Sequence, residues 1–124
     1  MARIERFEDI KAWQNARKLN KEIYAVTSQG DFAKDFALKD QLRRASISIM
    51  LNIAEGFARH THKEFIQFLY VAHGSAAEVQ AALYIALDQN YINQSKFKEL
   101  YQDTEQISKM IAGFIKYLRQ NNKR

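Results

Sequence analysis

The stretch FKELYQDTEQISKMIAGFIKYL, residues 97–118, carries the clearest structural pattern in this chain. Steps of three and four residues alternate along it, which is the heptad spacing of a helix that packs along one seam against other helices. The seam positions are Phe97, Leu100, Thr104, Ile107, Ile111, Phe114 and Leu118. We therefore predict a long bundle helix over residues 94–120, capped at its start by Asn93 or Ser95.

The composition of the whole chain also favours long helices. None of the 124 residues is proline, whereas average usage of about 5% would give roughly six. Proline breaks helix interiors but is common in turns and on edge strands, and only four glycines are present to form tight turns. The length suits one domain, which we expect to span residues 1–124 without a linker.

Three further helices are predicted before residue 94, approximately over residues 9–29, 35–57 and 61–90. The first is expected to begin near Asp9, because an acidic side chain suits the positive end of a helix dipole, and to end at Gly30. The start of the second is less defined and lies between Asp31 and Asp40.

The third helix has a capping box at its start, in which the Thr61 hydroxyl and the Glu64 carboxylate satisfy free backbone N–H groups. Four helices joined by short connections predict an all-α fold, an up-down-up-down antiparallel four-helix bundle. The second and third helices have more apolar surface than one core requires. This excess predicts that the bundle assembles with copies of itself.

Residues 65–87 could be mistaken for a membrane span, since Glu78 is their single formal charge. However, polar side chains are spread around the whole helix, namely Gln67, His73, Ser75 and Gln80. A buried helix of a water-soluble protein fits better, because charge at the bilayer centre costs about 2.5–3.5 kcal/mol. The first residues have no apolar signal core. We expect a cytoplasmic protein with no membrane contact.

Basic residues are concentrated towards the C-terminus. Residues 95–124 hold seven Lys and Arg against three acids, whereas residues 61–94 hold one against three. Lys116, Arg119, Lys123 and Arg124 close the chain with no acidic residue among them, and such a cluster can neutralise nucleic-acid phosphates. The alternative is a solvated terminus whose basic residues complement the helix dipole.

A second basic cluster surrounds the start of the third helix and consists of Arg59, His60, His62 and Lys63. Free amides and the dipole at a helix start favour an anion, although such a cluster is also typical of a polar surface loop. His60 and His62 lack the third and fourth ligands that a metal site needs, so we expect no metal.

Four polar residues of the second helix, Arg43, Arg44, Asn52 and Glu55, admit two interpretations. They could bind a ligand, or they could be hydrogen-bonded groups at a helix crossing or subunit interface, which we favour because buried polar groups must be paired. We interpret His73 and Glu78 in the same way. The sequence contains no cysteine, phosphate-binding loop, metal motif or nucleophile elbow, so neither a cofactor nor catalysis is expected.

Two stretches of the second helix, QLRRASISI at 41–49 and NIAEGF at 52–57, resemble the signature of a known family. This is the family of four-helix bundles encoded in 23S rRNA intervening sequences, also known as the S23 ribosomal protein family. Further similar segments follow in the family's order: FEDI at 7–10, WQ at 13–14, EF at 64–65, AHGS at 72–75 and Glu78. The resemblance covers nearly the whole chain. It departs between Gly30 and Lys39, where relatives often have a proline.

The resemblance implies a small bundle that forms a ring-like homopentamer, in a family with no established enzymatic activity. A related branch includes the accessory protein of diversity-generating retroelements, which binds nucleic acid and partners a reverse transcriptase. Together with the basic clusters, this predicts a non-enzymatic oligomeric bundle that binds RNA or DNA. The alternative is an adaptor that docks a protein partner without touching nucleic acid.

Overall fold

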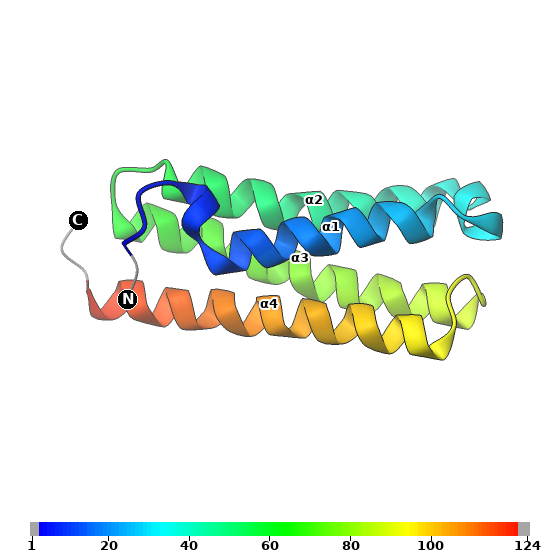
Figure 1. Cartoon of the computed structure of the whole chain (residues 1–124). Helices are drawn as coiled ribbons and strands as arrows, with labels where there is room; N and C mark the ends of the chain where they lie inside the picture. Colours follow the sequence, from blue (N-terminus) through cyan, green and yellow to red (C-terminus); the bar gives the residue numbers. More distant parts are fainter. Residues whose placement is uncertain (1–2, 122–124) are drawn as a thin grey trace.

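The computed structural model describes residues 3–121, which form a bundle of four α-helices (Figure 1). The helices are α1 (Lys11–Thr27), α2 (Phe36–Phe57), α3 (His62–Asp88) and α4 (Gln94–Gln120). Two short 3₁₀ helices, Phe7–Asp9 and Gly30–Lys34, precede α1 and α2, and no residue between 3 and 121 lies in a strand. The predicted all-α four-helix bundle is confirmed.

The connectivity places α1 and α3 at opposite corners of the bundle. Each of them packs against both α2 and α4, and the most extensive contact is between α2 and α3. The outward surfaces of α1 and α3 therefore face away from each other. This arrangement matters for the two surfaces described below.

The core is built from one buried row of side chains on each helix. On α4, five of the seven seam residues are buried, and Phe97 and Phe114 are half-buried. The Phe114 ring meets the buried Phe65 ring of α3 edge to face, with centroids 5.2 Å apart. On α3 the row contains several small residues, which let neighbouring helices approach closely: Ala72, Ser75, Ala76, Ala82 and Ala86.

Side-chain caps define the starts of three helices. The Asp35 carboxylate accepts from the Leu38 N–H at 3.0 Å, so α2 begins at Phe36, within the range left open by the sequence. Thr61 accepts from the Glu64 N–H at 3.1 Å, as predicted for α3. Asn93, rather than Ser95, caps α4. Each cap satisfies a backbone donor that has no partner within its helix.

The first helix differs from the prediction at both ends. Asp9 belongs to the short 3₁₀ helix, where its carboxylate accepts from the backbone N–H groups of Glu5 and Arg6, and α1 begins at Lys11. At the other end α1 stops at Thr27, before Gly30, which has a φ of 49° and opens the second 3₁₀ helix. The predicted range 9–29 was two residues too long at each end, because the extended backbone of Ile10 and of Gln29 separates α1 from the two 3₁₀ helices.

Gly56 marks the closest approach of α2 to α3. A Cβ atom at this position would lie 2.8 Å from the Phe65 ring and 2.8 Å from the Phe68 Cβ. Further along the same pair of helices, the Ser75 hydroxyl donates to the Ser48 hydroxyl at 2.7 Å. Small and hydrogen-bonding residues therefore allow α2 and α3 to pack more closely than larger side chains would.

The outward face of α3 is largely apolar and exposed, although the Tyr84 ring also packs against the Phe97 and Tyr101 rings of α4. Val71, Tyr84 and Ile85 expose 51%, 51% and 50% of their surfaces, and small exposed residues lie between them: Gly74, Ala77 and Ala81. We call these residues, together with Tyr70, the α3 face. None of the helices within residues 3–121 has the combined length and apolar character needed to cross a bilayer.

We predict that Gly56→Ala lowers the free energy of unfolding by about 1–2 kcal/mol. Alanine favours a helix by about 1 kcal/mol over glycine, but overpacking at a contact this short costs about 1–3 kcal/mol. Gly113→Ala on α4 is the matched control, because its new Cβ would meet nothing within 4 Å; it should add about 1 kcal/mol. Urea unfolding at one protein concentration measures both. Equal effects of the two substitutions would contradict the packing described here.

Candidate nucleic-acid interface

The antiparallel helices bring the two predicted basic clusters to the same end of the bundle (Figure 1). Arg59 and His60 lie in the connection from α2 to α3, and His62 and Lys63 lie in the first turn of α3. Lys116 and Arg119 lie near the end of α4. α4 ends beside the start of α3, as the Phe65–Phe114 contact shows. We call these six residues the basic end. Lys123 and Arg124 lie outside the described residues.

A groove between α3 and α4 forms part of the basic end. It has a volume of about 320 Å³ and is lined by Tyr70, His73, Ala112, Ile115, Lys116 and Arg119. The Arg119 guanidinium lies over the Tyr70 ring, 5.3 Å from its centroid, and donates to the Tyr70 hydroxyl. His73 is hydrogen-bonded through Nε2 to the Ser108 hydroxyl at 3.0 Å. The groove thus combines two cations with an aromatic ring.

The residues around the start of α3 are more strongly tied to the protein itself. Arg59 lies over the Phe68 ring at 4.7 Å, and its Nε is 3.8 Å from the Glu55 carboxylate. The His62 Nδ1 atom is buried and has no hydrogen-bond partner among the described residues. Lys63 is exposed. Glu55 offsets part of the positive charge here, so Lys116 and Arg119 provide the less compensated charge of the basic end.

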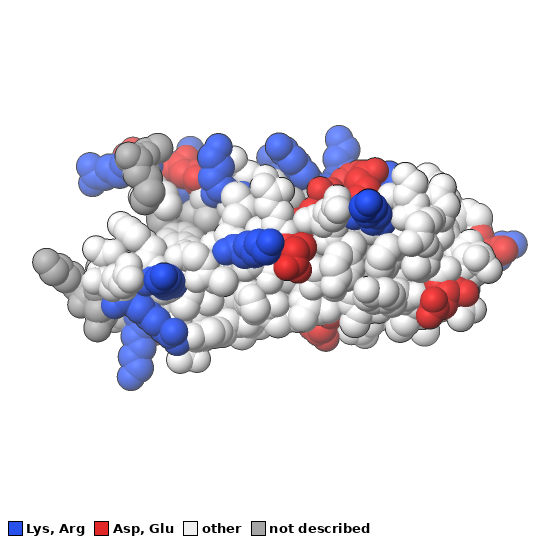
Figure 2. Space-filling view, turned by 90° about the horizontal axis from the view of Figure 1, so that it is seen from below, with Lys and Arg blue, Asp and Glu red and all other residues white. Residues whose placement is uncertain are grey.

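Charge is unevenly distributed over the visible surface. Figure 2 shows Lys and Arg at the left end of the molecule, where the basic end lies, and others along the upper edge, with acidic side chains mainly in the middle and at the right. The ion pairs found within residues 3–121 are exposed: Arg6–Glu8, Arg44–Asp40, Arg59–Glu55 and Lys96–Glu99. Exposed pairs contribute about 0–1 kcal/mol each, so they organise charge more than they stabilise the fold.

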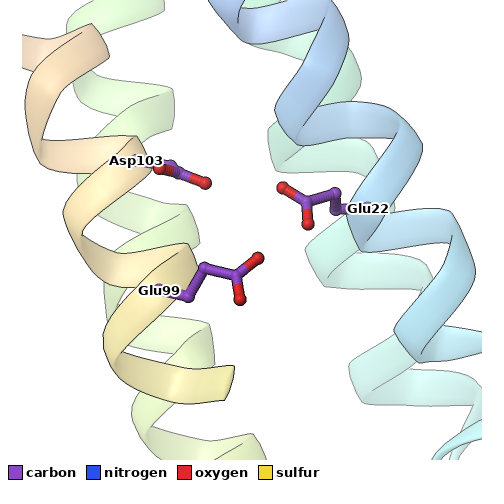
Figure 3. A group of neighbouring side chains, drawn as sticks. All are labelled: Glu22, Glu99 and Asp103. Carbon is purple, nitrogen blue, oxygen red and sulfur yellow. The ribbon is translucent and has the colours of Figure 1, made fainter. Parts of the chain in front are cut away.

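Three carboxylates that the sequence did not suggest meet between α1 and α4. Glu22 of α1 points towards Glu99 and Asp103 of α4, and one oxygen from each lies within 4.8 Å of the others (Figure 3). Partial burial, a hydrogen bond with Glu99 and the nearby negative charges raise the pKa of Glu22. The pKa of Glu99 is lowered because it accepts hydrogen bonds from Glu22 and Lys96. Of the two carboxylates, Glu22 is therefore the one that takes up a proton first as the pH falls. Neither His60 nor His62 takes part in this cluster.

A second surface missed by sequence reasoning is a groove along the outside of α1. Its volume is about 970 Å³, and its lining includes Trp13, Arg17, Lys21 and Tyr24, with Met50 of α2 at its side. The signal is present in the sequence as an aromatic–cation–cation–aromatic series at steps of four, four and three, which places all four side chains on one helix face. We call it the α1 groove.

Comparison with known proteins identifies the family of this bundle. The family model described as 23S rRNA-intervening sequence protein matches residues 8–113, which covers all of α1, α2 and α3 and most of α4. The chain belongs to this family.

A solved structure has a similar fold. It is a protein of unknown function from the S23 ribosomal protein family of Bacteroides thetaiotaomicron, with a TM-score of 0.77 and 23% identity. The alignment covers 85% of this chain and 98% of the other. None of the curated proteins compared with the chain matches it.

The polar residues of α2 that lie in the family-like stretches, Arg43, Arg44 and Asn52, have different surroundings. Arg43 crosses to the end of α1, where it donates to Thr27 Oγ1 at 2.8 Å and to Ser28 Oγ at 3.0 Å. Asn52 donates to the Ser48 carbonyl at 2.8 Å within α2. Arg44 is exposed and pairs with Asp40 one turn earlier. Arg43 is therefore the one of these three that joins two helices.

Glu55 and Glu78 also lie on the surface of the bundle. Glu55 is exposed beside Arg59, and Glu78 is exposed on α3 among the small residues of the α3 face. His73, five residues before Glu78, instead bonds to Ser108 of α4. These positions do not bring Glu55, His73 and Glu78 to one site.

We predict that Glu22→Gln raises the free energy of unfolding at pH 7 by about 0.5 kcal/mol, the size of repulsion between partly exposed charges. Because the pKa of Glu22 is raised on folding, the folded chain holds more protons than the unfolded chain above the ordinary glutamate value of about 4.3. Stability of the parent protein therefore falls as pH rises through that window. Below it, Glu22 is protonated in both states and the difference disappears.

Urea unfolding of both proteins at pH 7 and at pH 3.5 measures this effect. Glu78→Gln is the control, because Glu78 is exposed on the diagonally opposite helix. A stabilisation by Glu22→Gln that is the same at both pH values would contradict the raised pKa of Glu22.

Proposed function

We propose that this protein is a non-enzymatic, self-assembling helical bundle of the cytoplasm that binds RNA or DNA through its basic end. The observation that carries the proposal is that two basic clusters, separated by more than fifty residues of sequence, lie at one end of the bundle, where Lys116 and Arg119 line the groove beside Tyr70. Absence of cysteine from the chain is consistent with a reducing compartment.

The chemistry of the basic end suits a phosphate backbone. Lys116 and Arg119 are exposed, and neither takes part in the ion pairs found within residues 3–121. Their charge is therefore available to replace the counterions condensed on a nucleic acid. The Tyr70 ring under Arg119 orients the guanidinium, which lowers the entropy lost when it binds.

The catalytic alternative receives little support from the side chains that meet across helices. The hydroxyls of Ser46 and Ser75 donate to Asn20 and Ser48, and Thr27 and Thr104 bond to backbone carbonyls of their own helices. These contacts join or stabilise helices. The Ser108 hydroxyl does bond to His73 Nε2 at 3.0 Å, but no carboxylate among residues 3–121 is hydrogen-bonded to this histidine to orient it as a base. Binding is therefore the function that the arrangement favours.

We predict that the double variant Lys116→Gln, Arg119→Gln binds a labelled RNA or DNA strand more weakly and with a reduced salt dependence. Loss of two phosphate contacts should lower the slope of log K against log salt by about 1.4 on a single strand. The matched control is Lys98→Gln, Lys109→Gln, which removes the same charge from exposed positions nearer the middle and start of α4. Fluorescence anisotropy over a series of salt concentrations measures both.

Two results would contradict nucleic-acid binding through the basic end. One is no association with RNA or DNA even at low salt. The other is the same loss of affinity in the variant and in the control. A protein partner held in fixed stoichiometry after nuclease treatment, with no bound nucleic acid, would support the adaptor alternative instead.

Self-assembly is supported by the α3 face. Its exposed aromatic and aliphatic side chains lie near the two ends of the face, and the positions between them hold small residues and Glu78. Such a face is larger than isolated apolar side chains on a monomer, and the small residues would allow a second helix to pack closely. Assembly with cyclic symmetry, a homopentamer by family resemblance, would bring several basic ends to one rim and raise their combined potential.

We predict that Ala81→Glu reduces the assembled protein to its monomer mass of 14.5 kDa. The new carboxylate would be buried without a partner at the centre of the α3 face. Ala25→Glu is the matched control, since Ala25 is equally an exposed alanine but lies on α1. Light scattering at micromolar concentration measures the masses. A parent protein that is already monomeric would rule out self-assembly, and insensitivity to Ala81→Glu would exclude the α3 face.

A further inference from the structure

The α1 groove carries two pairs in which an arginine lies over an aromatic ring, one pair at each end. Near the start of the helix, the Arg17 guanidinium lies 6.0 Å from the centroid of the Trp13 ring. Near its end, the Arg43 guanidinium lies 4.2 Å from the centroid of the Tyr24 ring. Trp13 and Tyr24 are eleven residues apart, or about 16 Å along the helix. Lys21 lies between the two pairs.

The first pair is held in position by the residues before α1. The Phe7 ring contacts the half-buried Trp13 ring edge to face, with centroids 5.0 Å apart and an interplanar angle of 69°. This contact fixes the plane of the indole without stacking on it face to face. The ring therefore loses little further freedom if a planar group stacks on it.

The second pair is held by hydrogen bonds between helices. Arg43 reaches from α2 to Thr27 and Ser28, and Thr27 is itself buried. The Tyr24 ring that it covers remains 38% exposed. Arg43 is bound only to neutral oxygens in these contacts, so its positive charge is retained at the surface of the groove.

The groove as a whole is positively charged. Arg17, Lys21 and Arg43 take no part in the ion pairs found among residues 3–121. Glu8 lies at one end of the groove, but the Arg6 guanidinium pairs with it at 2.8 Å. Two cations of α1 thus lie between two aromatic rings, with Arg43 beside the second ring, on a surface whose negative charge is largely offset.

We propose that the α1 groove binds a single-stranded nucleic acid, with bases stacked at Trp13 and Tyr24 and phosphates on Arg17, Lys21 and Arg43. This inference rests on the proposed nucleic-acid binding and names the site and the form of the strand. Bases stack on aromatic rings and on guanidinium planes, and only unpaired bases have faces free to do so. A duplex would use the cations alone. An acidic peptide would likewise leave the two aromatic positions without a role.

The position of the groove is compatible with both parts of the proposed function. Its Trp13 end begins at the same end of the bundle as the basic end, because α1 starts where α2 ends. Since α1 is diagonal to α3, assembly through the α3 face would leave the α1 groove accessible in every copy.

The test uses Trp13, the single tryptophan of the chain, as a reporter. The full-length protein is titrated at low salt with fluorescently labelled fifteen-nucleotide oligothymidylate, with a fifteen-base-pair duplex and with polyglutamate. Anisotropy of the label detects binding anywhere on the protein, while tryptophan fluorescence detects stacking at Trp13. We expect the oligothymidylate to quench Trp13 strongly and the duplex and polyglutamate to quench it little.

Two exposed positions supply the variants. Tyr24→Leu keeps an apolar side chain but removes the ring, and it should weaken oligothymidylate binding about tenfold, the contribution of one stacked base. Lys21→Gln should reduce the salt slope by about 0.7. Lys98→Gln, exposed on α4, is the charge-matched control and should not change quenching. Circular dichroism checks that each variant keeps its helical content.

The outcomes separate this inference from the function on which it rests. Binding seen by anisotropy without quenching of Trp13, and unchanged in Tyr24→Leu, would overturn the α1 groove while leaving the basic end as the site. No anisotropy change with any nucleic acid would overturn both. Equal quenching by polyglutamate and oligothymidylate would show that the groove responds to charge alone, which would overturn base stacking and favour an acidic protein partner.

Discussion

Gly56 packs against Phe65 and Phe68 of α3 so closely that even a methyl group would come within 2.8 Å of both. This contact sets the separation of α2 and α3 at the point where the chain turns between them. The turn carries Arg59 and His60, and the first residues of α3 carry His62 and Lys63. Phe65 also meets Phe114, which places the end of α4 beside the same turn. One close helix contact therefore positions both halves of the basic end.

The two long surfaces of the bundle have different chemistry because α1 and α3 occupy opposite corners. The α3 face is apolar and rich in small residues, which suits contact with another helix. The α1 groove combines cations with aromatic rings, which suits a flexible polyanion with planar bases. A bundle that assembles through the first surface keeps the second one exposed. Assembly through the α3 face and binding in the α1 groove therefore use different residues, whereas Tyr70 belongs both to the α3 face and to the groove of the basic end.

Many residues of the candidate site could be predicted from local patterns, but the contacts between them could not. Charge clustering identified Lys116 and Arg119 near the end of the chain, and the Thr61 cap placed His62 and Lys63 at a helix start. The contacts of these residues could not be predicted, because Tyr70 and Arg119 are forty-nine positions apart and meet only through the packing of α3 on α4. The Arg43–Tyr24 pair was missed for the same reason. Glu22, Glu99 and Asp103 likewise come together only where α1 crosses α4.

By itself the sequence determined the number of helices, the buried row of α4 and the starts of α3 and α4, since periodicity and capping act within a few residues of the chain. Its local signals misplaced the ends of α1, where Asp9 and Gly30 enter 3₁₀ turns instead. Only the tertiary structure decided which side chains share a surface. That depends on the corner each helix occupies and on how closely neighbours approach, and these follow from packing between residues distant in sequence.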